Sequence, residues 1–314
     1  MDFDKEEIRL QIEKLAQKYA QTGQNLSANL EGLLYADYLK YWDYIQVDSL
    51  LSLQKPRTHF PDEMIFIVYH QITELYFKMI LWEMEQIAAQ EQPQADFFVA
   101  RLARINRYME MLAQSFEIMI EGMDIEQFRQ FRMSLLPASG FQSAQFRMIE
   151  ICATDFRNLV EKSYRPQLDH NSSFEEMYEH IYWKKGATEE ETQKKTITLE
   201  HFEQRYSDTF LKLAKEYQNK NLWQQYRKIQ PDDALQADLV KALRYFDYQV
   251  NVRWAHAHLK AAASYLKPKG QPIAATGGTN WTKYLPPNLQ KRIFYPKLWS
   301  PEEIEAWGRA ELQA

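Results

Sequence analysis

The stretch of sequence that decides the fold runs Pro61-Asp-Glu-Met-Ile-Phe-Ile-Val-Tyr-His-Gln-Ile-Thr-Glu-Leu-Tyr-Phe-Lys-Met-Ile-Leu81. Its spacing predicts one helix that sets a histidine and an acid among large apolar side chains. Four residues recur at steps of four, four and three: Phe66, His70, Glu74 and Phe77. Side chains at these steps share one face of a helix. On this pattern alone His70 is more often a satisfied core residue than a functional one, and both interpretations stay open.

The composition favours helices over turn-rich sheets. The chain has 314 residues, 45% of them hydrophobic, which is enough for a sizeable core, and only 9 glycines. Helical spacing of apolar residues recurs along the chain, at residues 3–20, 26–39, 95–121, 124–136, 141–162, 200–218 and 232–266. We therefore predict an all-α fold, a single-domain helical bundle over residues 1–314. The polar stretch 163–200 is interpreted as a solvated insertion with little function.

Charge and cysteine content narrow the class of protein. The net charge is −5 and the basic residues are dispersed, so nucleic acid is not an expected partner. No uninterrupted apolar run approaches the roughly 20 residues that span a bilayer, and the start of the chain does not resemble a signal peptide. The lone Cys152 excludes an internal disulfide and a cysteine-rich metal site. These features predict a cytoplasmic protein that does not bind membranes.

Two histidines in the helix predicted over residues 232–266 lie on opposite faces of that helix. His256 and His258 are two residues apart, so on a helix they point about 200° away from each other. His258 has Trp254 and alanines at steps of three and four, whereas the neighbours of His256 are mixed, and we expect His256 to face solvent. A neutral imidazole over an apolar slot of small residues suits an axial haem ligand. A buried structural histidine is the open alternative.

An arginine and two turn motifs could bind anions. Arg132 lies one turn after Phe128 on an aromatic-rich helix, and a guanidinium pressed toward an apolar surface needs a carboxylate from the protein or from a ligand. Ser139 lies where the next helix begins and could be its N-cap. The glycines of Thr276-Gly-Gly-Thr279 could bring backbone N–H groups to an anion or could form a plain turn.

At these residues the sequence resembles the tryptophan 2,3-dioxygenase family. The matching blocks occur in the order of the family from about residue 38 to 280, and the Ser-Gly-Phe-Gln-Ser block is the most specific of them. The blocks are Tyr41-x-x-Tyr44 with Asp48-x-Leu-Leu-x-x-Gln-x-Pro56, Phe66 to Lys78, Phe131 to Ser143 with Gln145-Phe-Arg147, Trp254-Ala-His-Ala-His258 and Thr276-Gly-Gly-Thr279.

The resemblance implies an all-helical homotetramer, similar in fold to indoleamine and tryptophan 2,3-dioxygenases, that binds one haem b per subunit and is active as Fe(II). His258 corresponds to the proximal ligand of the iron, and Trp254 is implied beside the haem. Ser139 would hydrogen-bond a haem propionate. His70 corresponds to the catalytic histidine on the distal side, which receives the indole N–H.

The resemblance also implies how the substrate is held. Phe66 would pack against the indole, Arg132 would bind the carboxylate beside Phe128, and Thr276 would hold the amino-acid end. Segment 1–56 would exchange contacts with a neighbouring subunit. Three of its residues would reach across to close the pocket there: Tyr41, Tyr44 and Ile45.

The implied reaction inserts both atoms of O₂ across the indole C2–C3 bond of L-tryptophan to give N-formyl-L-kynurenine, the first step of tryptophan catabolism by the kynurenine route. Three departures from the family pattern keep other substrates open. Phe128 stands where a tyrosine is usual, and Tyr69 and Asn280-Trp281 also differ. The alternatives are a haem enzyme of this fold with another indole or aromatic substrate, or a non-catalytic haem-binding or scaffold protein.

Overall fold

The computed structural model describes residues 5–135, 140–169, 171–188, 194–230, 233–266 and 286–309. No strand occurs in these residues, and two isolated β-bridges join Val160 with Ile181 and Thr188 with Lys195. Most of the described residues are helical, so the all-α prediction is confirmed. The chain divides into two compact units, Met1–Gln54 and Lys55–Ala314.

The described residues of the first unit form four helices. None of these helices contains a buried residue. Large apolar side chains remain exposed in it, including Leu34 at 80%, Tyr35 at 81% and Tyr38 at 96%. The helices are α1 (Lys5–Gln21), α2 (Leu26–Tyr35), α3 (Tyr41–Ile45) and α4 (Val47–Leu51).

The second unit is a helical bundle built on two long helices and the helices that cover them. Its α-helices in the described residues are α5 (Asp62–Ala88), α6 (Ala95–Glu121), α7 (Ile125–Phe131), α8 (Ala144–Ala153), α9 (Phe174–Glu179), α10 (Tyr182–Lys185), α11 (Ile197–Tyr217), α12 (Leu222–Lys228), α13 (Asp233–Tyr248), α14 (Trp254–Leu266), α16 (Pro287–Gln290) and α17 (Pro301–Glu305). Short 3₁₀ turns link several of them, at Arg132–Leu135, Gly140–Gln142, Phe156–Leu159, Arg165–Gln167 and Pro296–Leu298.

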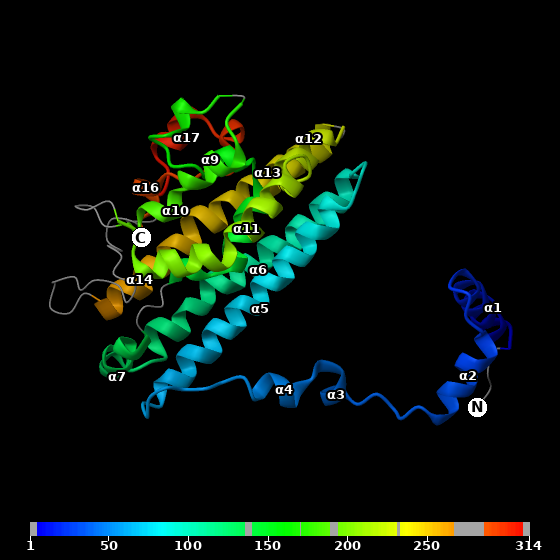
Figure 1. Ribbon diagram of the computed structural model, residues 1–314. Coiled ribbons are helices and arrows are strands. Elements are labelled where there is room, and N and C mark those ends of the chain that lie inside the picture. The colour runs from blue at the N-terminus through cyan, green and yellow to red at the C-terminus, as the bar shows by residue number, and fades with distance from the viewer. Residues whose placement is uncertain are drawn as a thin grey trace. The chain divides into compact units, whose positions relative to one another are not determined.

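Helices α5 and α6 form a long hairpin along one side of this bundle (Figure 1). Helices α13 and α14 pack along α6, and α8 packs between α5 and α11. The predicted apolar face of α6 is fully buried, and each side chain of this size contributes roughly 1.5–3 kcal/mol when removed from water. Its members are Phe98, Leu102, Ile105, Met109 and Leu112.

The helix predicted over residues 232–266 is present but interrupted. Residues Gln249–Arg253 form a π-helical turn between α13 and α14, and the backbone N–H of Trp254 bonds to the carbonyl of Gln249, five residues earlier. Such turns insert one extra residue into an α-helix. The side chains of α14 are therefore rotated about the helix axis, compared with where a continuous α-helix would place them.

Two predictions about the middle of the chain are wrong in detail. The helix expected over 141–162 is shorter, because α8 ends at Ala153 where Thr154 is extended. The stretch 163–200 is not simply a solvated insertion. Eight of its described residues are buried: Leu168, Tyr178, Ile181, Trp183, Lys184, Ala187, Thr198 and Leu199.

Helix α5 is the one described helix that is long and apolar enough to cross a membrane by length and composition. It packs along α6 and α8, and it carries two buried acids, Glu63 and Glu83. Glu83 is paired with Arg101 and Arg104, at 3.1 and 2.8 Å. These contacts lie on the inner face of α5, whose most apolar stretch is 22% buried.

Candidate functional site

His70 and Phe66 lie one turn apart on α5, and their rings are in contact. The ring centroids are 4.1 Å apart, and Nδ1 of His70 lies 2.7 Å from the carbonyl oxygen of Phe66. A carbonyl only accepts hydrogen bonds, so Nδ1 carries the proton and Nε2 of a neutral His70 is an acceptor. Burial lowers the pKa of His70, although the side chain keeps a large accessible area. The ring is therefore reachable while protein atoms surround it, and it is neutral at pH 7.

His258 lies on α14 and faces the same region. Its ring stacks on that of Phe116 from α6, with centroids 5.8 Å apart and planes 22° apart. Burial, together with the smaller effects of the nearby His70 and Arg147, lowers the pKa of His258 to about 4. Two neutral imidazoles from two helices thus lie near each other. The predicted neighbours of His258 are small and apolar as expected, since Ala255 and Ala261 are buried.

His256 does not behave as the spacing predicted. Its side chain is half-buried, and its Nε2 atom has no accessible surface. The expectation that His256 faces solvent is therefore wrong for this atom.

Two aromatic rings of α7 pack against Phe66. Phe131 meets it edge-on at 5.7 Å, and Phe128 lies 6.0 Å from it. Phe128 in turn contacts Tyr265 of α14 at 4.5 Å. The hydroxyl of Tyr265 donates to the carbonyl of Met119, which ties α14 to α6. These rings form an apolar wall beside His70.

Phe131, Phe116 and Tyr265 were not singled out from the sequence. Phe116 continues the predicted face of α6 at a step of four after Leu112, so a signal for it existed. Phe131 stood next to Arg132 in a recognised block. Tyr265 follows His258 at a step of seven on the same predicted helix, so helical spacing indicated that it shares the face of His258.

Arg132 follows this aromatic wall directly. It ends α7, with its backbone N–H bonded to the carbonyl of Phe128, and it is only 6% exposed. Burial lowers the pKa of its guanidinium, as expected for a cation held against apolar surface. The prediction of a buried arginine beside Phe128 is consistent with this placement.

Glu74 has a structural role in the described residues. Its carboxylate accepts hydrogen bonds from the Ser143 hydroxyl at 2.6 Å and from the Gln145 amide at 2.8 Å. Ser143 is also the N-cap of α8, accepting from the backbone of Phe146. The N-cap of α8 is thus Ser143 and not Ser139, which the sequence had suggested as a cap. The most specific sequence block ties α8 to α5 one turn after His70.

Several further site residues were predicted from the sequence. Ser139 and Thr276 lie outside the described residues, as do Asn280 and Trp281. Tyr41, Tyr44 and Ile45 form α3 of the first unit and are exposed. Their roles stay predictions. Trp254, in contrast, packs against Phe116 at 4.7 Å, one turn before His258.

The donor chemistry fits a haem better than a bare metal ion. Among the described residues no three His, Cys, Asp or Glu side chains gather as a metal site. A single neutral imidazole, stacked on a ring and flanked by alanines, matches the setting of an axial haem ligand. The fold and the site thus define an all-α protein with a paired-histidine, aromatic-walled region suited to a flat cofactor and a flat ligand.

Comparison with known proteins agrees with this class. A profile of the family described as tryptophan 2,3-dioxygenase matches residues 19–265. Tryptophan 2,3-dioxygenase of Xenopus laevis is 36% identical over 148 residues, covering 45% of this chain and 36% of that protein. The enzymes of Ruegeria sp. (strain TM1040) and Bacillus anthracis are 38% identical over 118 residues and 40% over 117, each covering 37% of this chain and 42% of the relative.

The matched part of the chain therefore spans less than half the length of these relatives. The family profile, however, covers most of the chain. The chain belongs to the tryptophan 2,3-dioxygenase family.

Proposed function

We propose that this protein is a haem-dependent dioxygenase that opens the indole ring of L-tryptophan with O₂ to give N-formyl-L-kynurenine, the first step of tryptophan catabolism by the kynurenine route. The observation that carries the proposal is the pair of neutral imidazoles, His70 on α5 and His258 on α14. One of them can hold the cofactor, and the other can receive the substrate.

His70 is the proposed acceptor of the indole N–H. Its Nδ1–H is engaged by the carbonyl of Phe66, so Nε2 presents a lone pair. The low pKa keeps that lone pair free of a proton at neutral pH. Phe66, packed against His70 at 4.1 Å, offers an apolar face for the flat indole. Together the two residues orient the ring that is to be opened.

His258 is the proposed ligand of the haem iron, with Trp254 and Phe116 packed at the same place. The bound haem, as Fe(II), supplies the activation of O₂. The protein's own contribution is to hold His258 neutral and oriented and to exclude water with alanines and aromatic rings. Ser139 is proposed to hydrogen-bond a propionate.

Arg132 is the proposed partner of the substrate carboxylate. A buried guanidinium next to the aromatic wall can form two parallel hydrogen bonds with a carboxylate. Phe128 lies one turn away and has no hydroxyl to add a further bond. Thr276 is proposed to hold the amino-acid end.

A homotetramer in the cytoplasm is proposed for the assembled protein, and two exposed apolar surfaces support it. The first unit has no buried residue in its helices, and from it Tyr41, Tyr44 and Ile45 would reach a neighbouring subunit. The outer face of α5 carries an exposed apolar stripe at helical steps. The stripe comprises Ile72 (41%), Leu75 (47%), Met79 (40%) and Trp82 (61%). Contiguous apolar surface of this kind marks protein interfaces.

A second candidate is a haem enzyme of this fold with another indole or aromatic substrate. Phe128 favours it, because a phenylalanine beside Arg132 offers the amino-acid end one hydrogen bond fewer than a tyrosine. An indole with a carboxylate but without an ammonium group fits this site equally well.

The deciding experiment uses the full chain purified with haem, reduced, and mixed with L-tryptophan in air. Formation of N-formyl-kynurenine, identified by mass, supports the first proposal. Turnover of indole-3-propionate or another aromatic substrate, with none of L-tryptophan, favours the second. If the protein binds haem but converts none of these substrates, the remaining interpretation is a non-catalytic haem-binding protein.

A further inference from the structure

The π-helical turn at Gln249–Arg253 determines which residues of α14 face the interior. The buried stripe of α13 recurs at steps of four, three and four, and the first buried residue of α14, Ala255, follows Val250 at a step of five, next to the half-buried Trp254 that also packs on the core. His258 follows Ala255 at a step of three and lies in the middle of the stripe that Ala255 begins. The α13 members of the stripe are Leu239, Leu243, Phe246 and Val250.

A continuous α-helix would place these residues differently. Each residue advances an α-helix by about 100°, so without the inserted residue the stripe would pass through Ala257. His258 would then lie about 100° to the side, and the exposed Lys260 would turn toward the bundle. The contact of His258 with Phe116 therefore depends on the π-helical turn being held.

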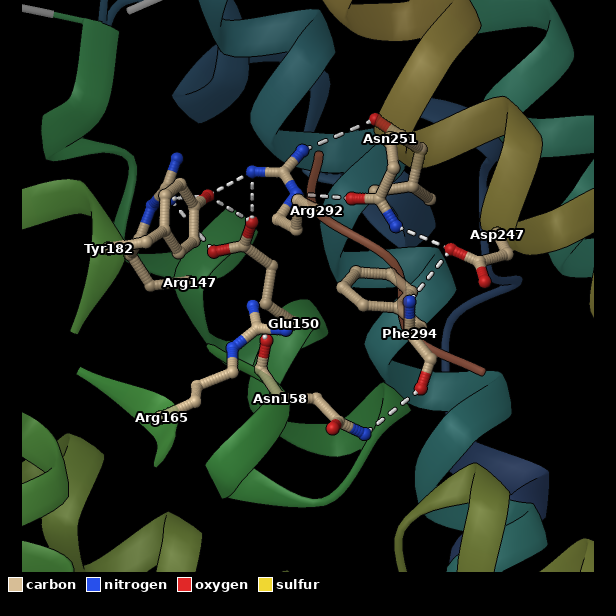
Figure 2. Close-up of polar contacts among 10 residues, drawn as sticks. Arg147, Glu150, Asn158, Arg165, Tyr182, Asp247, Asn251, Arg292 and Phe294 are labelled. Atoms are coloured by element: carbon tan, nitrogen blue, oxygen red, sulfur yellow. Dashed lines mark hydrogen bonds and ion pairs between the residues drawn. The ribbon is translucent and has the colours of Figure 1, made fainter. Parts of the chain in front are cut away.

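Buried polar contacts from the C-terminal segment hold this turn (Figure 2). Arg292 donates from Nε to the side-chain oxygen of Asn251 and from Nη2 to the carbonyl of Val250 at 3.4 Å. Asn251 in turn donates to Asp247 at 2.7 Å. The side chain of Asn251, within the π-helical turn, is thus fixed from both ends.

Asp247 closes the same network and is fully buried. Its two oxygens accept from the backbone N–H groups of Phe294 and Tyr295 at 2.9 and 3.0 Å and from the indole N–H of Trp299 at 3.0 Å. With the bond from Asn251, each oxygen accepts two hydrogen bonds. A buried carboxylate with four donors fixes its surroundings strongly, because loss of any donor leaves buried charge uncompensated.

Arg292 carries the network on to α8. Its guanidinium pairs with Glu150 at 2.7 Å and bonds to the hydroxyl of Tyr182, and Arg147 pairs with Glu150 at 2.8 Å. Helix α8 begins at Ser143, which is bonded to Glu74 on α5. One connected set of polar contacts therefore runs from the helix of His70 to the turn before His258.

We infer that Arg292 and Asp247 are positioning residues: they hold the π-helical turn and so set the rotation of α14 that brings His258 to face Phe116 and His70. The inference deepens the proposed function, on which the role of His258 rests. The rotation itself is a property of the apoprotein, so it can be measured without haem and without turnover.

The test reads the rotation of α14 by thiol labelling of the full-length apoprotein. Single cysteines are placed at Ala255, which is buried, or at Lys260, which is exposed, and each is labelled with a maleimide. Cys152 is buried and burial raises the pKa of its thiol, so it contributes little background. Each probe is combined with Arg292→Gln, or with the isosteric Asp247→Asn if the first variant does not fold.

Arg244→Gln is the matched control. Arg244 also joins α13 to the C-terminal segment, through Glu303 and the ring of Trp299, but it does not contact the π-helical turn. We expect Arg292→Gln to raise labelling at position 255 roughly tenfold, the factor that corresponds to about 1.4 kcal/mol, and to lower it at position 260. Arg244→Gln should leave both rates unchanged.

Opposite changes at the two positions report rotation of the helix, whereas a rise at both reports loosening without rotation. A rise at both positions, or no change at either, would overturn the inference. Haem titration of the same variants without probes then tests the link to His258. If the labelling shows rotation while haem affinity is unchanged, the inference stands and the assignment of His258 as the ligand is wrong.

Discussion

The hydroxyl of Ser143 donates to the carboxylate of Glu74 across 2.6 Å, and the same serine caps α8. One side chain therefore satisfies the first turn of α8 and ties that helix to α5, one turn after His70. The last serine of the Ser-Gly-Phe-Gln-Ser block thus has a structural role. It aligns the helix that carries His70.

Replacing Ser143 with alanine should remove both interactions. A cap contributes about 0.5–2 kcal/mol, and a hydrogen bond to a charged group about 1.5–3 kcal/mol. We expect Ser143→Ala to lower the free energy of unfolding by roughly 2–4 kcal/mol in urea titrations. Ser173→Ala is the control, because Ser173 caps α9 by its bond to Glu176 alone. Equal losses in the two variants would mean that the bond to Glu74 contributes nothing.

The assignment of the haem ligand gives a second prediction. His258→Ala should abolish haem binding, because the variant lacks the axial imidazole, and the change is read from the absorption spectrum of the reconstituted protein. His256→Ala is the matched control two residues away, with a half-buried ring on the opposite side of the same helix. We expect it to retain haem with an unchanged spectrum. Loss of haem from His256→Ala and not from His258→Ala would transfer the role to His256.

The carboxylate role of Arg132 gives a third prediction. Arg132→Gln should raise KM for L-tryptophan by roughly 10- to 150-fold, the equivalent of about 1.5–3 kcal/mol for a charge-assisted hydrogen bond. Tryptamine, which lacks the carboxylate, should bind the variant as well as it binds the parent protein. Arg129→Gln is the control on the same helix, where the guanidinium donates to the carbonyl of Tyr265. An equal loss for both ligands would argue against the role.

Phe128 supplies a fourth prediction about substrate choice. If the substrate has an amino-acid end, Phe128→Tyr should add one hydrogen bond near Arg132 and lower KM for L-tryptophan by roughly two- to tenfold. The measurement is steady-state kinetics with L-tryptophan and with indole-3-propionate side by side. A rise in KM for L-tryptophan would favour the second candidate function, because it would show that the native pocket is shaped for a different ligand.

Much of this architecture could be predicted from the sequence, because the long helices bury continuous apolar faces. The bounds of α6 follow from five residues in phase, all of which are buried. The positions of Phe66, His70 and Glu74 on one face of α5 follow in the same way. The burial of Arg132 agrees with the expectation that its guanidinium lies toward an apolar surface.

Other features of the structure could not be predicted, because they depend on contacts between residues that are far apart in the sequence. The π-helical turn depends on Arg292, which is 41 residues from Asn251 in sequence. The burial of Trp183 and Lys184 depends on packing against distant helices, since their own segment is polar. Each case rests on long-range contacts, whereas spacing reports only the face of one helix.

Glu63 gives a prediction for the pH dependence of stability. Its carboxylate accepts from the backbone N–H groups of Arg57 and Thr58 at 2.8 and 2.7 Å and from the Thr58 hydroxyl at 2.5 Å. These bonds fix the segment that precedes α5, just before the turn that carries Phe66. The side chain is only 1% exposed but lies close beneath the surface, where few protein atoms surround it.

The direction of the effect follows from the pKa of Glu63. Burial by itself would raise this pKa, but the bonds from Thr58 and Arg57 outweigh it, so the pKa is lowered from 4.5. The unfolded state therefore binds the proton more tightly, and the stabilisation is present above pH 4.5 and is lost as the pH falls through the folded-state pKa.

At pH 7, Glu63→Gln should lower the free energy of unfolding by roughly 1.5–3 kcal/mol. The difference from the parent protein should shrink in urea titrations below about pH 4. Glu175→Gln removes an acid whose pKa is also lowered, by Lys215, but which is exposed, so it should change stability little at either pH. A difference for Glu63→Gln that stays constant from pH 7 to pH 3 would show that the carboxylate charge is not what holds this segment.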